Sequence, residues 1–433
     1  MLTRHTRRQF IKRASAVSVG AWIATGTPVW GESRSANEKL DVGVIGANGR
    51  GRANLNAVGE TENIVALCDV DESRLQESAA DFSSSAAYSD YRQMLEEEKL
   101  DAVIVSTPDH THAPAAIAAM QVGLHVYCEK PLAHSVYEAR RMAEVAKETG
   151  VVTQMGNQSH ATDRLRRVVE IVRSGQLGPI HEVVCWSNKQ FSGGERPTET
   201  PPVPDSLNWD LWLGPANDRP YHPDYVPFTW RGWWDFGSGN FGDMGCHIID
   251  APCWGLELDY PTSILAAGPP PNAESSPTAL VVRYDFPARG ERPPVRLTWY
   301  DGSWAPPYEM IDDVELPAQG ALIMGEAGQL LFPHSRGDVV LFPQERFIDI
   351  DAPEPMFPRP PHHHAEWIEA CKGRGETLSD FEYGGRMTEF IMAGVVAYRM
   401  GRVLEWDGPN MKAVNCPEAD ALISPPMRKG WEV

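Results

Sequence analysis

The chain has 433 residues, 42% of them hydrophobic and 23% charged, which is typical of a folded protein of two domains and excludes a disordered chain. Its formal net charge of -20 at pH 7 disfavours nucleic acid and anionic membrane surfaces as partners. The seven cysteines form no C-x-x-C pair, so we expect buried thiols rather than a disulfide framework or a zinc site.

Residues 1–36 have the pattern of an export signal. The pair Arg7-Arg8 is followed by Gln9-Phe10 and by a mildly apolar stretch over residues 14–30. This order resembles a twin-arginine signal, which directs folded proteins out of the cytoplasm. The apolar stretch is too interrupted for a stable membrane span. We therefore predict a periplasmic protein with residues 1–36 as signal and linker; a basic disordered tail is the alternative.

A phosphate-binding loop follows the first predicted strand. The run Asp41–Ile45 is apolar and β-rich, and it ends in residues 46–51, Gly-Ala-Asn-Gly-Arg-Gly. Gly46 permits a tight turn, Asn48 tolerates a left-handed backbone, and Gly51 lets the next helix pack against the strand. The helix N-terminus then faces a pyrophosphate. We expect the loop to bind a dinucleotide through Gly46, Asn48, Gly49, Arg50 and Gly51.

Asp69 lies at the position where a carboxylate distinguishes NAD from NADP. It ends the second apolar run, residues 64–68, about 20 residues after the glycine loop. A carboxylate there binds the adenosine ribose hydroxyls and repels a 2′-phosphate, which predicts NAD rather than NADP. The alternative is a strand-end aspartate that caps a turn.

Strands and helices alternate up to residue 158, which predicts a doubly wound parallel sheet in a domain over residues 37–158. Ligands of such sheets bind at the carboxyl ends of the strands, where residues 107–112, 129–131 and 156–158 fall. The further expected strands cover residues 101–106, 125–129 and 151–155, and the expected helices cover residues 75–82, 91–98, 113–122 and 136–149.

Four of these segments together resemble the Gfo/Idh/MocA family of oxidoreductases, which includes glucose-fructose oxidoreductase and inositol dehydrogenases. They are the loop 46–51, Asp69, residues 106–112 (Ser-Thr-Pro-Asp-His-Thr-His) and residues 129–133 (Glu-Lys-Pro-Leu-Ala). The resemblance implies an α/β protein with an N-terminal Rossmann doubly wound parallel sheet. It also implies a C-terminal α/β domain over residues 159–433, with a large open, mainly antiparallel sheet that binds substrate and forms oligomers.

The resemblance implies catalytic residues as well. Family members use the lysine of the Glu-Lys-Pro motif with an aspartate and a histidine from a later helix, which correspond to Lys130, Asp243 and His247. The last two lie in residues 242–250, similar to the family pattern D-x-G-x-H-x-x-D. The cofactor-binding residues implied are Gly46, Asn48, Gly49, Arg50, Gly51, Asp69, Thr107, Pro108, His110, His112, Glu129, Lys130 and Asn157.

These residue types suit the oxidation of a secondary alcohol. His247 is a base for the hydroxyl proton near neutral pH, and Asp243 orients the imidazole or holds a substrate hydroxyl. Lys130 shares the charge on the reacting oxygen, and its pKa is expected to fall in a dry, electropositive site. Asp250 shares their helical face by spacing, but a structural role is favoured for it. A surface lysine and a core histidine are the alternatives for Lys130 and His247.

An aromatic segment, residues 207–241, precedes the catalytic helix. Pro and Gly interrupt it, which predicts an irregular loop. Its flat rings suit the C–H faces of a sugar, and they equally suit fixing the loop to the protein or to a partner subunit. Arg231 and Asp235 are candidates for contacts with substrate hydroxyls. The expected substrate-binding residues are Lys130, Trp230, Arg231, Asp243 and His247.

The histidine clusters predict no metal site. His110 and His112 lie in one loop and are expected to pack beside the nicotinamide, and the contiguous residues 362–364 cannot all face one ion.

The second half predicts an open sheet. One face covers the active site and the other is free to bury against a second subunit, so we predict a homo-oligomer, a dimer or a tetramer. The expected strands cover residues 180–187, 263–268, 279–286, 295–300, 321–325, 329–332 and 339–342, followed by a long helix over residues 378–400.

Three functions fit these patterns. The first, which we predict, is an NAD-dependent oxidoreductase that transfers a hydride between a nicotinamide and a secondary alcohol of a sugar or polyol. The second is an NAD-dependent, redox-assisted glycoside hydrolase; the Thr-His-Gly segment of such enzymes is not evident, and residues 242–247 stand there instead. The third is a non-catalytic sugar-binding protein that retains its nucleotide.

Overall fold

The structure is a computed structural model that describes residues 39–307 and 316–433, and the export signal predicted for residues 1–36 lies outside them. Among the described residues, no helix combines the length and the apolar character needed to cross a membrane. All seven cysteines are free thiols and six are buried, as expected.

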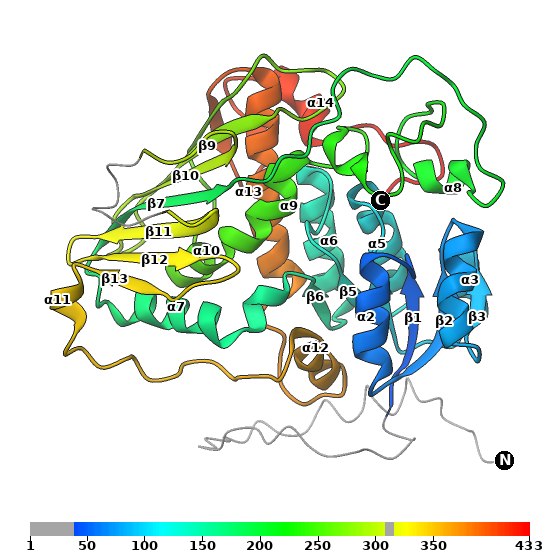
Figure 1. The fold of residues 1–433 in the computed structure, drawn as a ribbon, viewed down its shortest axis with the longest axis horizontal. Helices are drawn as coiled ribbons and strands as arrows, with labels where there is room; N and C mark the ends of the chain where they lie inside the picture. The colour runs from blue at the N-terminus through cyan, green and yellow to red at the C-terminus, as the bar shows by residue number, and fades with distance from the viewer. Residues whose placement is uncertain (1–38, 308–315) are drawn as a thin grey trace. The chain divides into compact units, whose positions relative to one another are not determined.

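The N-terminal sheet has six parallel strands in the order β3-β2-β1-β4-β5-β6 (Figure 1). The order reverses between β1 and β4, which is the topological switch point of a doubly wound Rossmann sheet and confirms the predicted fold. The strands are β1 (Asp41–Ile45), β2 (Asn63–Cys68), β3 (Ala86–Tyr88), β4 (Ala102–Val105), β5 (His125–Cys128) and β6 (Thr153–Met155). The helices between them are α2 (Arg50–Gly59), α3 (Glu72–Asp81), α4 (Tyr91–Glu97), α5 (His112–Gln121) and α6 (Val136–Thr149).

The apolar runs became the central strands because helices cover both faces of the sheet. Every residue of β4 is buried, as expected for a parallel strand without polar alternation. Strand β3 was not predicted. It has three residues, lies at the edge and is only half-buried, so it lacks the apolar run that identifies its neighbours.

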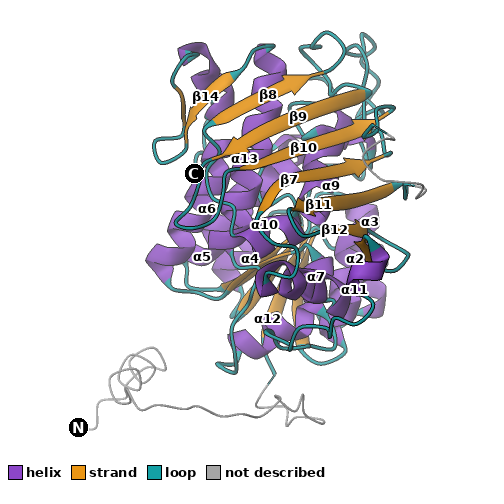
Figure 2. Cartoon of the chain, turned by 90° about the vertical axis from the view of Figure 1, so that its left-hand side faces the viewer, coloured by secondary structure: helices purple, strands orange, loops and turns teal. Residues whose placement is uncertain are grey.

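The C-terminal sheet has nine strands in the order β13-β12-β11-β7-β10-β9-β8-β14-β15 (Figure 2). Only β7 and β10 pair in parallel, which confirms the predicted, mainly antiparallel sheet. The strands are β7 (Ile180–Ser187), β8 (Ser263–Ala267), β9 (Ala279–Phe286), β10 (Val295–Gly302), β11 (Gln319–Gly325), β12 (Gln329–Pro333), β13 (Val340–Phe342), β14 (Leu404–Asp407) and β15 (Lys412–Ala413). The helices are α7 (Asp163–Ser174), α8 (Trp209–Leu213), α9 (Gly239–Ile248), α10 (Asp250–Leu256), α11 (Gln344–Phe347), α12 (His363–Cys371), α13 (Phe381–Met400) and α14 (Asp420–Ile423).

The two sheets share one hydrophobic core. Helix α13 packs against both α6 of the Rossmann domain and β8 of the second sheet. Helix α12 inserts Trp367 and Ile368 into the cluster that contains Val42 and Leu55 of the first domain. Residues from the C-terminal half therefore complete the core of the Rossmann domain, and this packing fixes the second sheet against the edge where ligands bind.

Residues 207–241 are largely irregular, with two short regular pieces that were not predicted. These are α8 and a turn of 3-10 helix over Thr229–Gly232, and α9 already begins at Gly239. Helix α9 ends at Ile248 and α10 begins at Asp250, so Asp243 and Asp250 do not share one helix as the spacing predicted.

We predict that Gly51→Ala lowers the free energy of unfolding by about 2–4 kcal/mol in urea denaturation. A methyl group at residue 51 would overlap the carbonyl oxygen of Gly46, which is backbone and cannot move aside. The control is Ala53→Gly, at an exposed position of the same helix, for which a loss of about 1 kcal/mol is expected. An equal or smaller loss in Gly51→Ala would contradict the close packing of loop and helix.

Candidate active site

A cavity of about 750 Å³ lies at the carboxyl-terminal edge of the Rossmann sheet. The ends of β1 and β2 and the loops after β4 and β5 form one wall, and residues from the segment 204–231 together with α9 form the other. The cavity thus joins both domains. The predicted site residues that line it are Gly46, Asn48, Gly49, Arg50, Asp69, Thr107, Pro108, Glu129, Lys130, Trp230, Arg231 and His247.

The glycine loop leaves the start of α2 open to a ligand. Gly46 has a φ of 79°, and a Cβ there would crowd the backbone carbonyl of Ser106. Gly49 occupies the N-cap with a φ of 60°, and no side chain caps the helix. The first turn of α2 also carries no acidic residue, so the positive end of its dipole is available to an anionic group.

Lys130 and Asp243 form an ion pair between the two domains. Lys130 Nζ lies 2.6 Å from Asp243 Oδ1 and also donates to the backbone oxygen of Asp243 at 3.0 Å. Arg231 Nε donates to the same carboxylate oxygen at 3.3 Å. The two paired side chains are only 12% and 11% exposed. One carboxylate therefore holds two cations at the wall of the cavity.

The expected fall in the pKa of Lys130 does not occur. Burial acts to lower this pKa, but the Asp243 carboxylate, followed by Glu129 and Asp109, outweighs burial and raises it. For Asp243, burial acts to raise the pKa, and Lys130 and Arg231 reverse the effect and hold it well below its ordinary value. Because three carboxylates surround Lys130, the site is not electropositive, and both members of the pair stay charged near neutral pH.

His247 lies one turn after Asp243 and lines the same cavity. Its Nδ1 is buried, and no group among the described residues hydrogen-bonds it. Burial and the nearby Lys130 ammonium hold the pKa of His247 well below its ordinary value. The imidazole is therefore neutral at pH 7, rather than titrating near neutrality as the sequence led us to expect.

Two family models together match most of the chain. One describes the NAD-binding Rossmann fold of an oxidoreductase family and matches residues 40–157, and the other describes the C-terminal alpha/beta domain of that family and matches residues 162–281 and 318–433. The chain belongs to the Gfo/Idh/MocA family of oxidoreductases. Its N-terminal domain is therefore an NAD-binding domain.

Relatives within the Gfo/Idh/MocA family are dehydrogenases and catabolic proteins. Myo-inositol 2-dehydrogenase of Thermotoga maritima is 30% identical over 33% of this chain and 43% of its own length. Rhizopine catabolism protein MocA of Rhizobium meliloti is 29% identical over 53% of this chain and 61% of its own. The chain thus spans less than two thirds of each of these relatives.

A solved structure shares the fold over nearly its whole length. The WlbA dehydrogenase of Bordetella pertussis, in complex with NADH and UDP-GlcNAcA, matches with a TM-score of 0.62 and 19% identity, over 85% of this chain and 99% of that one.

The residues present in this Gfo/Idh/MocA protein fit NAD. The uncapped start of α2 suits the pyrophosphate, and Asp69 lines the cavity at the end of β2, where an adenosine ribose would lie. Burial raises the pKa of Asp69 to about 6, although the backbone N–H of Asp71 and the charge of Arg74 act against this. Asp69 is therefore mostly ionised above pH 6 and repels a 2′-phosphate.

Two predicted histidines serve the loops rather than lining the cavity. The ring nitrogens of His110 lie 3.3 Å from the carbonyl oxygen of Phe236 and 2.9 Å from that of Trp212, so this side chain holds the aromatic segment. The ring nitrogens of His112 each lie 2.8 Å from a carbonyl oxygen, one of Thr107 and one of Pro131. His112 thereby ties the loop after β4 to the loop that carries Lys130.

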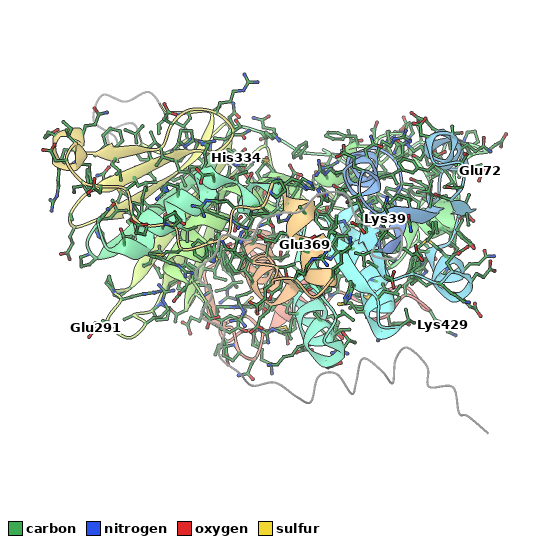
Figure 3. The ribbon with its side chains drawn as sticks, turned by 90° about the horizontal axis from the view of Figure 1, so that it is seen from below. Lys39, Glu72, Glu291, His334, Glu369 and Lys429 are labelled. Atoms are coloured by element: carbon green, nitrogen blue, oxygen red, sulfur yellow. The ribbon has the colours of Figure 1, made fainter. Side chains whose placement is uncertain are left out.

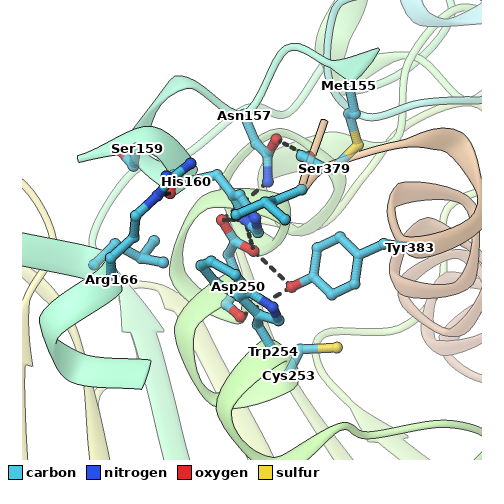
Figure 4. A network of polar contacts seen from close by, with 12 residues as sticks. Met155, Asn157, Ser159, His160, Arg166, Asp250, Cys253, Trp254, Ser379 and Tyr383 are labelled. Atoms are coloured by element: carbon cyan, nitrogen blue, oxygen red, sulfur yellow. Dashed lines mark hydrogen bonds and ion pairs between the residues drawn. The ribbon is translucent and has the colours of Figure 1, made fainter. Parts of the chain in front are cut away.

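Asn157 also lies away from the cavity. Its amide nitrogen donates to Asp250 Oδ2 at 2.9 Å, and its amide oxygen accepts from Ser379 (Figure 4). Asp250 further accepts from the half-buried Tyr383 and contacts His160, and the other side chains of this group are buried. Asn157 therefore belongs to a network that joins η3 (Gln158–Ala161), α10 and α13. This network agrees with the structural role expected for Asp250.

Sequence reasoning missed two polar residues near the site. Asp109 lines the cavity, is 5% exposed, and belongs to the same Thr-Pro-x-x-x-His loop that was used for its neighbours. His334 follows β12 on the C-terminal domain (Figure 3), with its ring 5.4 Å from that of His247. Asp109 was identifiable from its place in the motif, whereas nothing in the sequence connects His334 with His247.

Some rings of the aromatic segment fix the segment to the protein, and others face the cavity where a sugar would bind. Trp212, Tyr225, Trp230, Trp233 and Phe236 are buried against one another in a cluster of their own, which fixes the segment. Of the five tryptophans in the segment, only Trp212 and Trp230 line the cavity, together with Tyr221 and Phe228.

We predict that Asp69→Ser lowers the preference for NAD over NADP at least tenfold, because a carboxylate no longer opposes the 2′-phosphate while Arg74 remains in the cavity wall. The preference is measured as the ratio of dissociation constants in cofactor titrations at pH 8. The matched control is Asp90→Ser, which removes another acid of the cavity wall whose carboxylate is already bound by Arg92. An unchanged ratio in Asp69→Ser would show that another group selects the cofactor.

Proposed function

We propose that the protein transfers a hydride between NAD and a secondary alcohol of a sugar or polyol. The observation that supports this most is the convergence of Lys130, paired with Asp243, and the neutral imidazole of His247 on one cavity that also holds the glycine loop. An ammonium group and a neutral imidazole thus share the space in which a nicotinamide and a hydroxyl-bearing carbon would meet.

Lys130, Asp243 and His247 each have a separate role in the proposed reaction. NAD, when bound, supplies the hydride acceptor or donor. Lys130 donates a hydrogen bond to the reacting oxygen and stabilises its negative charge, because Asp243 keeps the ammonium group protonated and oriented. His247 forms a hydrogen bond with an adjacent hydroxyl through its neutral imidazole and fixes which carbon faces the nicotinamide.

The other wall suits a polyhydroxylated ring. Trp230 and Arg231 both line the cavity; the Arg231 guanidinium lies 4.2 Å from the centre of the Trp230 ring, and its Nε donates to Asp243. Aromatic faces bind the C–H surfaces of sugars, and charged donors bind hydroxyls. The names of the relatives, which include a myo-inositol dehydrogenase and a levoglucosan dehydrogenase, agree with this substrate class.

We further propose that the protein acts in the periplasm after twin-arginine export and that it forms a homo-oligomer. Val183 and Cys185 of β7 belong to the main core, so Val184 and Trp186 point to the opposite face of the sheet, where both are buried within this chain. The half-buried Tyr300, Val340 and Phe342 pack against this cluster, and they are the apolar surface that a partner subunit would cover.

We predict that Lys130→Met lowers kcat/KM at least 100-fold, because the charge on the reacting oxygen is no longer shared. Lys99→Ala, an exposed lysine of the same domain, is the control and should keep full activity. The assay follows NADH formation with purified protein, NAD⁺ and a panel of inositols, free sugars and glycosides. Full activity of Lys130→Met would overturn the assignment of Lys130.

The same panel separates the remaining functions. Net NADH formed from a free sugar or polyol supports the proposal. Aglycone release without net NADH would identify a redox-assisted glycoside hydrolase instead. Tight nucleotide binding without either product would identify a sugar-binding protein.

A further inference from the structure

A second cavity, of about 220 Å³, lies behind the loop that carries Asp109. Its wall includes Ser238, His134 and Glu138, together with Arg399 of α13. These groups are polar, and the volume is sufficient for water. This cavity is distinct from the one that holds the glycine loop. The 107–112 loop lies between them, because Asp109 lines the first cavity whereas His110 lines the second.

One hydrogen bond separates the two cavities. Ser238 Oγ donates to Asp109 Oδ2 at 3.0 Å, and both residues are nearly inaccessible, at 3% and 5% exposed. Asp109 lines the substrate cavity, whereas Ser238 lines the second cavity.

Ser238 is placed for this bond rather than for capping its helix. It occupies the N-cap of α9, yet its hydroxyl makes no capping hydrogen bond to the first turn. A side-chain carbon at Gly242 would overlap Ser238 Oγ, so the glycine one turn later leaves room for the hydroxyl. An N-cap serine ordinarily stabilises its helix by accepting a hydrogen bond from the first turn, and here its hydroxyl donates to a carboxyl instead.

The proposed reaction needs a group that accepts a proton. Lys130 is held as an ammonium ion and Asp243 as a carboxylate, while the pKa of His247 is held well below its ordinary value by burial. Burial raises the pKa of Asp109 to about 7, although Arg231 and Lys130 act against this. Asp69 of the same wall, with a pKa of about 6, lies at the end of β2, where the adenosine ribose is expected. Among the groups around Lys130, Asp109 is therefore the carboxyl that can both accept and release a proton near neutral pH.

We propose that Asp109 accepts the proton released during alcohol oxidation and that Ser238 passes it to the second cavity. This inference rests on the proposed function. In the oxidation, the carbinol C–H bond breaks with its electron pair going to NAD⁺, the O–H bond breaks, and the carbonyl C=O bond forms. The hydroxyl proton goes to Asp109, either directly or across Lys130. Asp109 then donates to Ser238 Oγ, whose own proton moves to water in the second cavity.

Charged groups from several elements face Asp109 and set its response to pH. Lys130 after β5 and Arg231 in the 229–232 turn act to lower its pKa, and Asp243 of α9 acts to raise it. Asp109 in turn raises the pKa of Glu138 on α6, which burial brings to about 7, and of the Cys128 thiol on β5. Glu138 on the second cavity is thus able to receive the proton in the same pH range as Asp109.

We predict that Asp109→Asn lowers kcat for oxidation 10- to 100-fold and removes the rise of kcat through about pH 7. Ser238→Ala should lower kcat less than tenfold with little change in KM, and Gly242→Ala should have the same effect because it displaces the hydroxyl. The matched control is Asp301→Asn. Asp301 is also buried, with a pKa raised by burial to about 7, but it lines neither cavity. An unchanged pH profile in Asp109→Asn would overturn the proposal.

Infrared titration of the cofactor-free protein provides a readout that does not depend on turnover. Glu138 and Asp301 also titrate near pH 7, so the readout is the difference between the spectra of the wild type and Asp109→Asn. This difference should contain one protonated carboxyl component that is lost on raising the pH through about 7, and Ser238→Ala should shift its frequency. If the wild type oxidises no alcohol with NAD⁺, the proposed function fails. If it does so but the difference spectrum lacks this component and the pH profile survives in Asp109→Asn, the proton path alone fails.

Discussion

The ion pair of Lys130 and Asp243 is the contact on which the site depends. Lys130 follows β5 of the Rossmann sheet, and Asp243 lies on α9, which packs beneath the second sheet, so the pair is formed only when both halves are in place. The mutual attraction of two mostly buried charges offsets the cost of taking them out of water, and loss of one partner leaves an uncompensated charge. The charged lysine at the cavity wall therefore depends on the correct packing of the two domains.

The pair and the burial of its neighbours give the titratable groups of the site different protonation states. Lys130 and Asp243 are fixed as charges, the imidazole of His247 is fixed as neutral, and the buried carboxyl of Asp109 is left to titrate near neutral pH. Neighbouring groups whose pKa values are driven apart are the usual means by which an active site assigns acid, base and electrostatic roles. A pKa of Lys130 lowered into the neutral range would remove this division.

The sequence was sufficient for the parts of the fold that are set locally. The apolar runs identified β1, β2, β4 and β5, and the glycine spacing identified the loop before α2, because burial on both faces and close backbone packing leave a direct mark on composition. The juxtaposition of Lys130 and Asp243, 113 residues apart, followed only from the family resemblance. Strand β3 was missed because an exposed edge strand of three residues needs no apolar run.

The rest depends on contacts that no local pattern records. Asn157 was expected at the cofactor, but Asp250 and Ser379 draw it into a buried network, and helix α9 stops before Asp250. His110 follows the family motif in sequence, yet it binds carbonyl groups of the distant aromatic segment. The pKa of Lys130 was expected to fall in an electropositive site, but it rises because three carboxylates act on the ammonium group. Their positions come from helix α9, the loop after β4 and the loop after β5.

The coupling between Lys130 and Asp243 can be measured without knowing the substrate. A double-mutant cycle compares the free energies of unfolding of Lys130→Met, Asp243→Leu, the double variant and the wild type in urea. The account predicts that each single variant loses about 3 kcal/mol or more, and that the double variant loses no more than the worse single variant, since both charges are then absent. Losses that simply add would contradict a coupled pair and, with it, the arrangement of the site.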